Sequence, residues 1–255
     1  GSAIVQGLLA RGVPARRLAV ADPDPATRRR AAQRFHLHVH RHNLHVLRDA
    51  QVMIVAVKPQ QVPGLIAQLA PHLTRRHLVI SIAAGMTVRW LQQRLPDVPI
   101  IRVMPNLPAT VGYGFSAMAP GRLARARHLK IAEAIFGAVG AAVVLPERSF
   151  DGITAVSGSG PAYVFFLVDA WERAARSLGL PPTVAARAIR STLEGSVKLL
   201  SASDDSASTL IARVASKGGT TEAALRVLAR RRVSAHLVDA IRAAAKRSKE
   251  LQCRS

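Results

Sequence analysis

The pattern of strands and helices changes abruptly near residue 146, and this change constrains the fold more than any other feature of the chain. Before that point, short apolar runs such as RLAVAD and VMIVAVKP alternate with helical stretches, which is typical of a parallel sheet covered by helices. After it, strand signals disappear, and long helical stretches are separated by SGSGP, GLPP, SASDDS and SKGGTT. We therefore predict an α/β domain over residues 1–146 and an all-helical domain over residues 147–255.

The sequence given opens on a helix, with no strand before it. In GSAIVQGLLARG, the apolar residues Ile4, Leu8 and Leu9 recur at helical spacing, and Gly12 is a suitable C-terminal stop. In a doubly wound sheet the strand before this helix is the central one. We therefore expect the sequence to start partway into its first domain, with the first strand missing.

Gly1 and Asp22 stand at the spacing of a dinucleotide-binding domain. A glycine before a helix lets a pyrophosphate approach the free N–H groups, and a carboxylate about twenty residues later holds the adenosine ribose. These residues predict a Rossmann-type domain that binds a nicotinamide dinucleotide, although an ordinary N-cap and an Asp-Pro turn account for the same letters. A carboxylate at Asp22 favours NADH, whereas an arginine from Arg28–Arg30 turned toward the ribose favours NADPH. The choice between the two stays open.

Two further apolar runs end in small or turn-forming residues, AVKPQQV and SIAAG, at the strand ends where open α/β sheets bind ligands. The small side chains of Ala83, Ala84 and Gly85 allow a flat ring to approach the backbone. Lys58 either faces the cofactor phosphates or ribose, or is simply solvated. Likewise SGSGPAY is either a substrate or nicotinamide contact through Ser157 or Ser159, or a joint between domains.

The histidine-rich stretch HLHVHRHNLH raises the question of a metal site. His36, His38 and His40 alternate as on one face of a strand. No Cys, Asp or Glu lies within the stretch, however, and Arg34 and Arg41 repel a cation. We therefore predict no metal site and interpret the stretch as a solvated edge.

The stretch SKGGTTEAAL places two glycines and two threonines before a helix. Gly218 and Gly219 permit backbone angles at which successive N–H groups converge on an anion, and the hydroxyls of Thr220 and Thr221 stand beside them. This arrangement indicates a pocket for a small carboxylate. An ordinary threonine N-cap explains the same residues.

Composition limits the function classes. The chain has 36 Lys and Arg against 15 Asp and Glu, for a net charge of +21, but the basic residues are scattered and aromatic residues make up only 4%. Nucleic-acid bases would have few aromatic side chains to stack on, so we favour a solvated basic surface over a nucleic-acid-binding one.

No apolar run approaches the roughly 20 residues of a membrane span. The chain also shows no signal-peptide pattern, and its single cysteine, Cys253, cannot form an internal disulfide. We expect a cytoplasmic protein without membrane association.

The helical stretches over residues 160–178 and 182–200 are apolar around much of their circumference. Such helices require a partner surface. We therefore predict a homodimer built through the helical domain.

Five motifs, AVKPQQV, SIAAGMT, RVMPNLPATVGYG, SGSGPAYVF and SKGGTTEAAL, together resemble the pyrroline-5-carboxylate reductase family in their order and spacing. The resemblance covers essentially the whole chain. It implies a Rossmann domain, a helical domain that interlocks into dimers and often decamers, and the last step of proline synthesis. In that step NADPH or NADH reduces 1-pyrroline-5-carboxylate to L-proline.

The resemblance also implies two sets of site residues. Cofactor contacts are implied at Gly1, Ser2, Ala21, Asp22, Asn43, Ala56, Val57, Lys58, Pro59, Ile82, Ala83, Ala84 and Glu147. Substrate contacts are implied at Asp204, Ser216, Gly218, Gly219, Thr220 and Thr221. Thr221 matches the residue that hydrogen-bonds the substrate ring nitrogen, and it is the one catalytic residue implied.

The chain also departs from the family pattern. Lys217 replaces a usual proline, and SASDDSAS replaces a usual acid-His-Pro run, which weakens the transfer of a role to Asp204. Two alternatives follow: a related imine or β-hydroxyacid reductase, or a truncated, silent relative that acts as a dimeric or basic nucleic-acid-binding protein.

Overall fold

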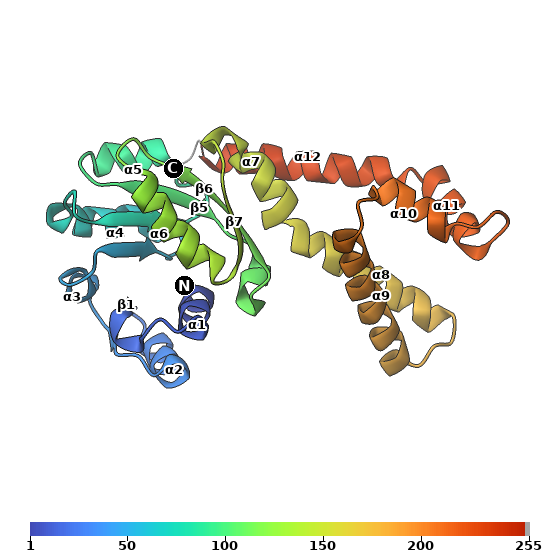
Figure 1. The fold of residues 1–255 in the computed structure, drawn as a ribbon, viewed down its shortest axis with the longest axis horizontal. Helices are drawn as coiled ribbons and strands as arrows, with labels where there is room; N and C mark the ends of the chain where they lie inside the picture. The colour runs from blue at the N-terminus through green and yellow to red at the C-terminus, as the bar shows by residue number, and fades with distance from the viewer. Residues whose placement is uncertain (253–255) are drawn as a thin grey trace. The chain divides into compact units, whose positions relative to one another are not determined.

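The computed structural model describes residues 1–252, and the single cysteine, Cys253, lies outside the described residues. The chain forms two compact units (Figure 1). The first unit comprises Gly1–Pro161 and the residues from Ala244 on, and the second comprises Ala162–Ala243. The predicted boundary at residues 146 and 147 follows the change from strands to helices, whereas these units are defined by packing. That boundary stays a prediction.

The first unit contains a five-stranded sheet in the order β3-β4-β5-β6-β7. Strands β3, β4 and β5 are parallel, β6 is antiparallel to β5, and β7 is parallel to β6. Their bounds are Val52–Val55, Leu78–Ser81, Ile100–Met104, Gly114–Pro120 and Gly140–Val144. The parallel strands are connected by helices, as the alternating sequence pattern predicts.

Strands β1 (Val20–Ala21) and β2 (Val39–His40) form a separate parallel pair. The sequence pattern predicts one doubly wound sheet, but no hydrogen-bonded ladder joins this pair to β3 in the described chain. An open groove of about 810 Å³ has Leu18, next to β1, and Val52 and Ile54 of β3 among its lining residues.

Helices cover both faces of the large sheet. The helices of the first unit are α1 (Ser2–Ala10), α2 (Pro25–Phe35), α3 (Asn43–Leu47), α4 (Val62–Leu69), α5 (Val88–Arg94), α6 (Ala126–Gly137) and α7 (Phe150–Ile153). Short 3₁₀ turns occupy Ala15–Arg17, Pro59–Gln61, Ala70–His72, Leu107–Val111 and Glu147–Ser149. Capping sets where α2 begins: the side chain of Asp24 accepts hydrogen bonds from the N–H groups of Ala26 and Thr27, and Pro25 follows as the first helical residue.

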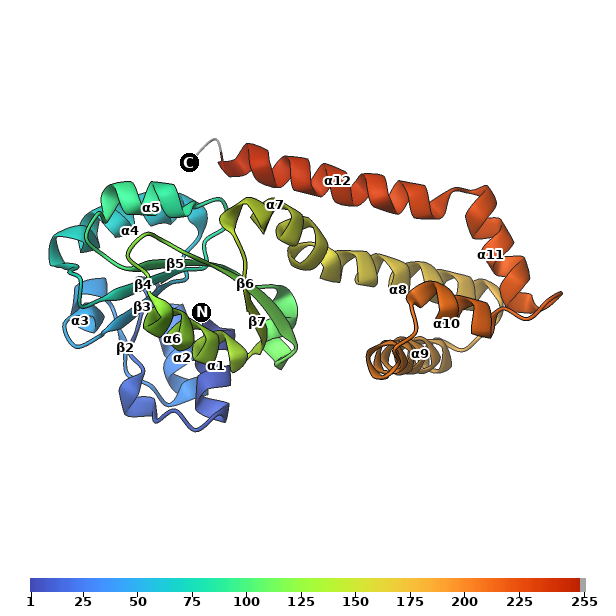
Figure 2. The same ribbon diagram turned by 45° about the horizontal axis from the view of Figure 1, so that its top comes forward.

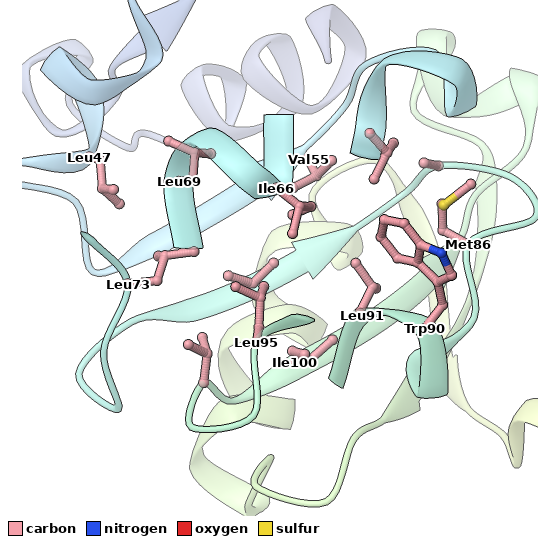
Figure 3. Packing of buried hydrophobic residues seen from close by; sticks show 14 residues of the cluster. Leu47, Val55, Ile66, Leu69, Leu73, Met86, Trp90, Leu91, Leu95 and Ile100 are labelled. Carbon is pink, nitrogen blue, oxygen red and sulfur yellow. The ribbon is translucent and has the colours of Figure 1, made fainter. Parts of the chain in front are cut away.

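The strands are apolar on both faces because both faces are buried. In β4, Val79 packs with Ile66, Leu91 and other residues from α4 and α5 on one face. Figure 3 shows Ile66 and Leu91 in this cluster. Leu78 and Ile80 point to the opposite face, where they join a cluster with residues of α1 and α6 that includes Ile4 and Phe136. This period-two alternation fixes the register of the sheet, since a slip of one residue would exchange the two cores.

The second unit is all-helical, as predicted (Figure 2). Few of its apolar side chains are buried within the chain itself. Phe165, Phe166 and Trp171 of α8 are exposed by 59%, 68% and 42%, as expected for helices that pack against another chain. The helices are α8 (Gly160–Ser177), α9 (Pro182–Ala202), α10 (Ala207–Val214), α11 (Thr220–Arg230) and α12 (Val233–Gln252). The first two residues of α8 and the end of α12 belong to the first unit.

Helix α8 continues from α7 through a π-helical turn at Thr154–Gly158. The helical stretch Glu147–Ser177 therefore reaches 31 residues and is, by length and composition alone, apolar enough to cross a membrane. The sequence pattern predicts no apolar helix of this length, because the glycines of SGSGP indicate a break within the stretch. A helix that packs between chains has the same composition.

Candidate functional site

The carboxyl ends of parallel strands bring several predicted cofactor residues to one edge of the first unit. Gly1 is the N-cap of α1, and no side chain caps this helix. A Cβ atom at Gly1 would lie 3.5 Å from the Cβ of Ala56, just after β3. The Ile82 N–H donates to the Val55 carbonyl at 3.1 Å, which places the residues after β4 beside those after β3. A helix N-terminus without side-chain bulk, next to small residues, fits a dinucleotide pyrophosphate.

The residues after β3 and β4 differ in their exposure. Ala84 is exposed, whereas Ala83 is only 4% exposed, packs in the core and donates its N–H to the Ser81 hydroxyl. Ala84 is therefore the alanine available to a ligand. Lys58 is exposed, so both interpretations of its role are open.

Asn43, a predicted cofactor residue, begins α3 and is half-buried. Its side-chain amide donates to the Gln68 Oε1 atom on α4 at 3.0 Å. This hydrogen bond ties α3 to α4 and holds Asn43 in a fixed position near the end of β2.

Asp22 follows β1, as the sequence spacing predicts, and its N–H donates to the His40 carbonyl at the end of β2. Its carboxylate accepts a hydrogen bond from the Asp24 N–H at 2.9 Å. Arg28 donates to the backbone carbonyls of Asp22 and Pro23 at 3.0 and 2.8 Å. These bonds support the turn into α2, so in this structure the Arg28 guanidinium binds the backbone rather than extending toward a ribose.

Glu147, a predicted ligand contact, is engaged by protein groups. Its Oε1 atom accepts hydrogen bonds from the Val88 N–H at the start of α5 (2.7 Å) and from the Arg102 guanidinium (2.8 Å). The Arg102 side chain is 3% exposed and lies over the Phe150 ring, 4.7 Å from its centroid. The arginine inside the apolar strand IIRVM was the sequence signal for this buried ion pair, and we did not interpret it.

Asn106 is a second residue that the sequence reading did not single out. It follows β5, and its amide donates to the Ser157 hydroxyl at 3.0 Å, while its carbonyl oxygen accepts from the Phe115 N–H at 2.8 Å. Ser157 belongs to the π-helical turn before α8, a kind of turn that is common at functional sites. Asn106 therefore fixes this turn to the edge of the sheet.

In the second unit, the predicted carboxylate pocket is a tight bend before α11. Gly218 has φ +73°, and a Cβ at Gly219 would lie 2.5 Å from the Ser216 hydroxyl oxygen, so each position requires glycine for its own reason. The Gly218 N–H donates to the Glu222 carboxylate, and the Gly219 N–H donates to the Ser216 carbonyl.

Helix α11 begins at Thr220 without a side-chain cap. The N–H groups of its first residues have no partner within the helix. They are therefore the donors that remain for an anion at this bend.

Asp204 is exposed. The adjacent Asp205 accepts a hydrogen bond from the Ser203 hydroxyl and forms an ion pair with Arg213. The structure therefore gives Asp205, rather than Asp204, the fixed position in this loop.

Comparison with known proteins covers both parts of the chain. Residues 147–251 match the family described as pyrroline-5-carboxylate reductase dimerisation, and residues 1–85 match the family described as NADP oxidoreductase, coenzyme F420-dependent. A pyrroline-5-carboxylate reductase from Synechocystis is 36% identical over 98% of this chain and 96% of the relative.

Solved structures agree with these matches. A pyrroline-5-carboxylate reductase from Coxiella burnetii aligns with a TM-score of 0.90 and 32% identity over 98% of this chain and 95% of that chain. A Plasmodium falciparum pyrroline carboxylate reductase with NADP bound aligns with a TM-score of 0.90 and 26% identity over 99% of this chain and 94% of that chain. The α/β and helical architecture predicted from the sequence is confirmed, and the chain belongs to the pyrroline-5-carboxylate reductase family.

Proposed function

We propose that this protein reduces 1-pyrroline-5-carboxylate to L-proline, with NADPH or NADH as the hydride donor. The observation that carries the proposal is the similarity to pyrroline-5-carboxylate reductases along nearly the full length of both chains. A silent relative or a nucleic-acid-binding protein is not favoured. The reaction is the last step of proline synthesis.

A bound NADPH or NADH would supply the hydride that converts the C=N bond of the protonated cyclic imine to the CH–NH bond of proline. The imine is already a strong electrophile once it is protonated. The protein therefore has to bind the substrate, orient it and exclude water. No nucleophilic side chain is needed.

The cofactor residues that we propose lie along the strand edge of the first unit. The free N–H groups at the start of α1 suit the pyrophosphate, and Asp22 suits the adenosine ribose. The proposed set is Gly1, Ser2, Ala21, Asp22, Asn43, Ala56, Val57, Lys58, Pro59, Ile82, Ala83, Ala84 and Glu147. Within this set Ala83 and Glu147 act through packing and hydrogen bonding in the protein.

The substrate residues that we propose lie at the bend before α11. The substrate carboxylate accepts hydrogen bonds from the N–H groups of Thr220 and Thr221, where the helix dipole also favours an anion. The Thr221 hydroxyl hydrogen-bonds the ring nitrogen, which gains a lone pair as the hydride arrives. Ser216, Gly218 and Gly219 shape the bend, and Asp204 completes the set carried over from the family.

We further propose a cytoplasmic homodimer, with assembly to a decamer as the larger form. The support for a dimer is the match to a dimerisation family and the exposure of Phe165, Phe166 and Trp171 on α8. Light scattering coupled to gel filtration distinguishes monomer, dimer and decamer.

Thr221→Val tests the proposed mechanism, with Thr221→Ser as the matched control that keeps a hydroxyl. Loss of one hydrogen-bond donor at a reacting centre lowers kcat by about ten- to a thousandfold. We expect this loss in the valine variant and most of the rate in the serine variant. Full turnover by Thr221→Val at saturating substrate would remove Thr221 from the mechanism. Turnover measured across cyclic imines and β-hydroxyacids separates this activity from that of a related reductase.

A further inference from the structure

Four imidazole rings form a chain around β2 and the start of α3. The ring centroids of His38 and His40 are 4.4 Å apart, those of His40 and His45 are 6.1 Å apart, and those of His42 and His45 are 5.5 Å apart, all in edge-to-face geometry. The backbone joins this cluster directly to Asp22, because the Asp22 N–H donates to the His40 carbonyl at 3.1 Å. The imidazole cluster (His38, His40, His42 and His45) therefore lies beside the residue proposed for the adenosine ribose.

The cluster is not arranged for a metal ion. Imidazole nitrogens bind a metal at about 2.1 Å from a single point. Within residues 1–252, no three His, Cys, Asp or Glu side chains are placed to share a metal ion. A phosphate group accepts hydrogen bonds through three oxygens at about 2.8 Å each, so it suits donors that stand farther apart.

The charges around the cluster favour an anion. From residue 36 to residue 48 the sequence has no carboxylate, Arg41 and Arg48 add positive charge, and Asp49 follows Arg48. The neighbouring carboxylate, on Asp22, accepts the Asp24 N–H, and Arg28 on α2 binds backbone carbonyls. Of the other charged groups on or next to α2, Asp24 accepts the N–H groups of Ala26 and Thr27, Arg30 donates to Thr27, Arg34 donates to Gln6, and Arg29 is exposed. The imidazoles therefore share this region with more arginine side chains than carboxylates.

We propose that His40, His42 and His45 bind the 2′-phosphate of NADPH, and that proton uptake at His40 makes the preference for NADPH over NADH increase as the pH falls. The proposal rests on the proposed use of a nicotinamide dinucleotide. The three histidines would counteract the effect of the Asp22 carboxylate, which alone favours the unphosphorylated ribose of NADH.

The direction of the pH effect follows from the free protein. Burial, and then the charges of His38 and His45, lower the pKa of His40 below its ordinary value. The imidazole is therefore neutral near pH 7.5, and a bound phosphate dianion raises its pKa so that a proton is taken up on binding. Binding with proton uptake strengthens as the pH falls. The increase in affinity for the 2′-phosphate stops near pH 6, because the phosphate itself begins to lose its second negative charge there.

The test uses adenosine 2′,5′-bisphosphate, which carries the 2′-phosphate but no nicotinamide, and 5′-AMP, which lacks the 2′-phosphate. Calorimetric titration of the full chain should show the bisphosphate binding about tenfold more tightly at pH 6 than at pH 8. The affinity for 5′-AMP should change less than twofold. Equal pH dependence of the two nucleotides, or no binding of the bisphosphate, overturns the proposal.

Histidine variants show which side chains bind the 2′-phosphate. His45→Gln and the double variant His40→Gln/His42→Gln should each weaken bisphosphate binding at pH 6 at least fivefold. Thermal unfolding should be unchanged, because His42 and His45 are exposed and His40 is only partly buried. His36→Asn is the matched control, since His36 is exposed at φ 53°, a backbone conformation that asparagine tolerates. It should bind as the parent protein does. Unchanged binding by the glutamine variants overturns the proposal. A chain that binds the bisphosphate in this way yet reduces no imine refutes the proposed function alone.

Discussion

Replacement of Glu147 separates a role in folding from a role in ligand binding. In Glu147→Ala the Val88 N–H at the start of α5 loses its acceptor, which costs about 1 kcal/mol. The same change leaves the Arg102 guanidinium, 3% exposed, without its carboxylate. Removal of one partner from a buried ion pair costs about 3–5 kcal/mol. Because Glu147 is itself 30% exposed, water reaches the pair, and we take about 3 kcal/mol as the total loss of unfolding free energy.

Two further variants sharpen this expectation. Glu147→Gln keeps an oxygen acceptor for both donors but not the charge, so we expect a loss of about 1–1.5 kcal/mol. Adding Arg102→Met to Glu147→Gln removes the unpaired cation and keeps an apolar contact on the Phe150 ring. The double variant should therefore be more stable than Glu147→Gln alone, as is found when buried ion pairs are replaced by apolar side chains.

The assay is urea unfolding followed by circular dichroism, with the affinity for NADPH measured in parallel by its fluorescence. The expected order of stability is wild type, then Glu147→Gln, then Glu147→Ala. A Glu147→Ala protein within about 0.5 kcal/mol of wild type, which is the scatter of ordinary surface substitutions, refutes the reasoning. If that protein also binds NADPH more weakly, Glu147 acts as a ligand contact instead.

Three other predictions concern the first unit. Burial and adjacent arginine charges lower the pKa of His128, so the unfolded chain binds the proton more readily than the folded chain does. The unfolding free energy should therefore fall as the pH drops below about 6.5. His128→Gln should make the unfolding free energy depend less on pH in this range. Gly140→Ala should lower the unfolding free energy, measured by urea unfolding, by more than about 2 kcal/mol. The reason is that φ is +145° and the new Cβ would lie 2.0 Å from the Gly114 carbonyl oxygen. The control Gly137→Ala should leave the unfolding free energy unchanged, because no atom outside its own helix lies within 4 Å of its new Cβ. Asn106→Ala should speed hydrogen exchange in the π-helical turn, and unchanged exchange would contradict its positioning role.

The fold was predictable because each of its signals is local. The alternation of apolar runs with helical stretches locates β3 to β7, and the loss of strand signals after Pro146 marks the helical part. The glycines at the bend before α11 indicate a special backbone, and Gly218 has the positive φ that only glycine adopts easily. Such features depend on residues within a few positions of each other, so a single sequence displays them.

The partners of the site residues were not predictable in the same way. Arg102 and Glu147 are 45 positions apart, and Asn106 and Ser157 are 51 apart, so each pair exists only after the sheet and the first turn of the helical part have packed. The histidine stretch shows the same limit: its letters suggest a metal site or a solvated edge, and only the ring geometry decides what ligand it suits.

The bend before α11 shows how a partner that is near in sequence can still change the chemistry. Its glycines predict N–H groups aimed at an anion, but the Gly218 N–H already binds a carboxylate, that of Glu222 on the next turn. The Gly219 N–H binds the Ser216 carbonyl. Under the proposed function, the substrate carboxylate would therefore use the first N–H groups of α11, where the helix dipole is strongest.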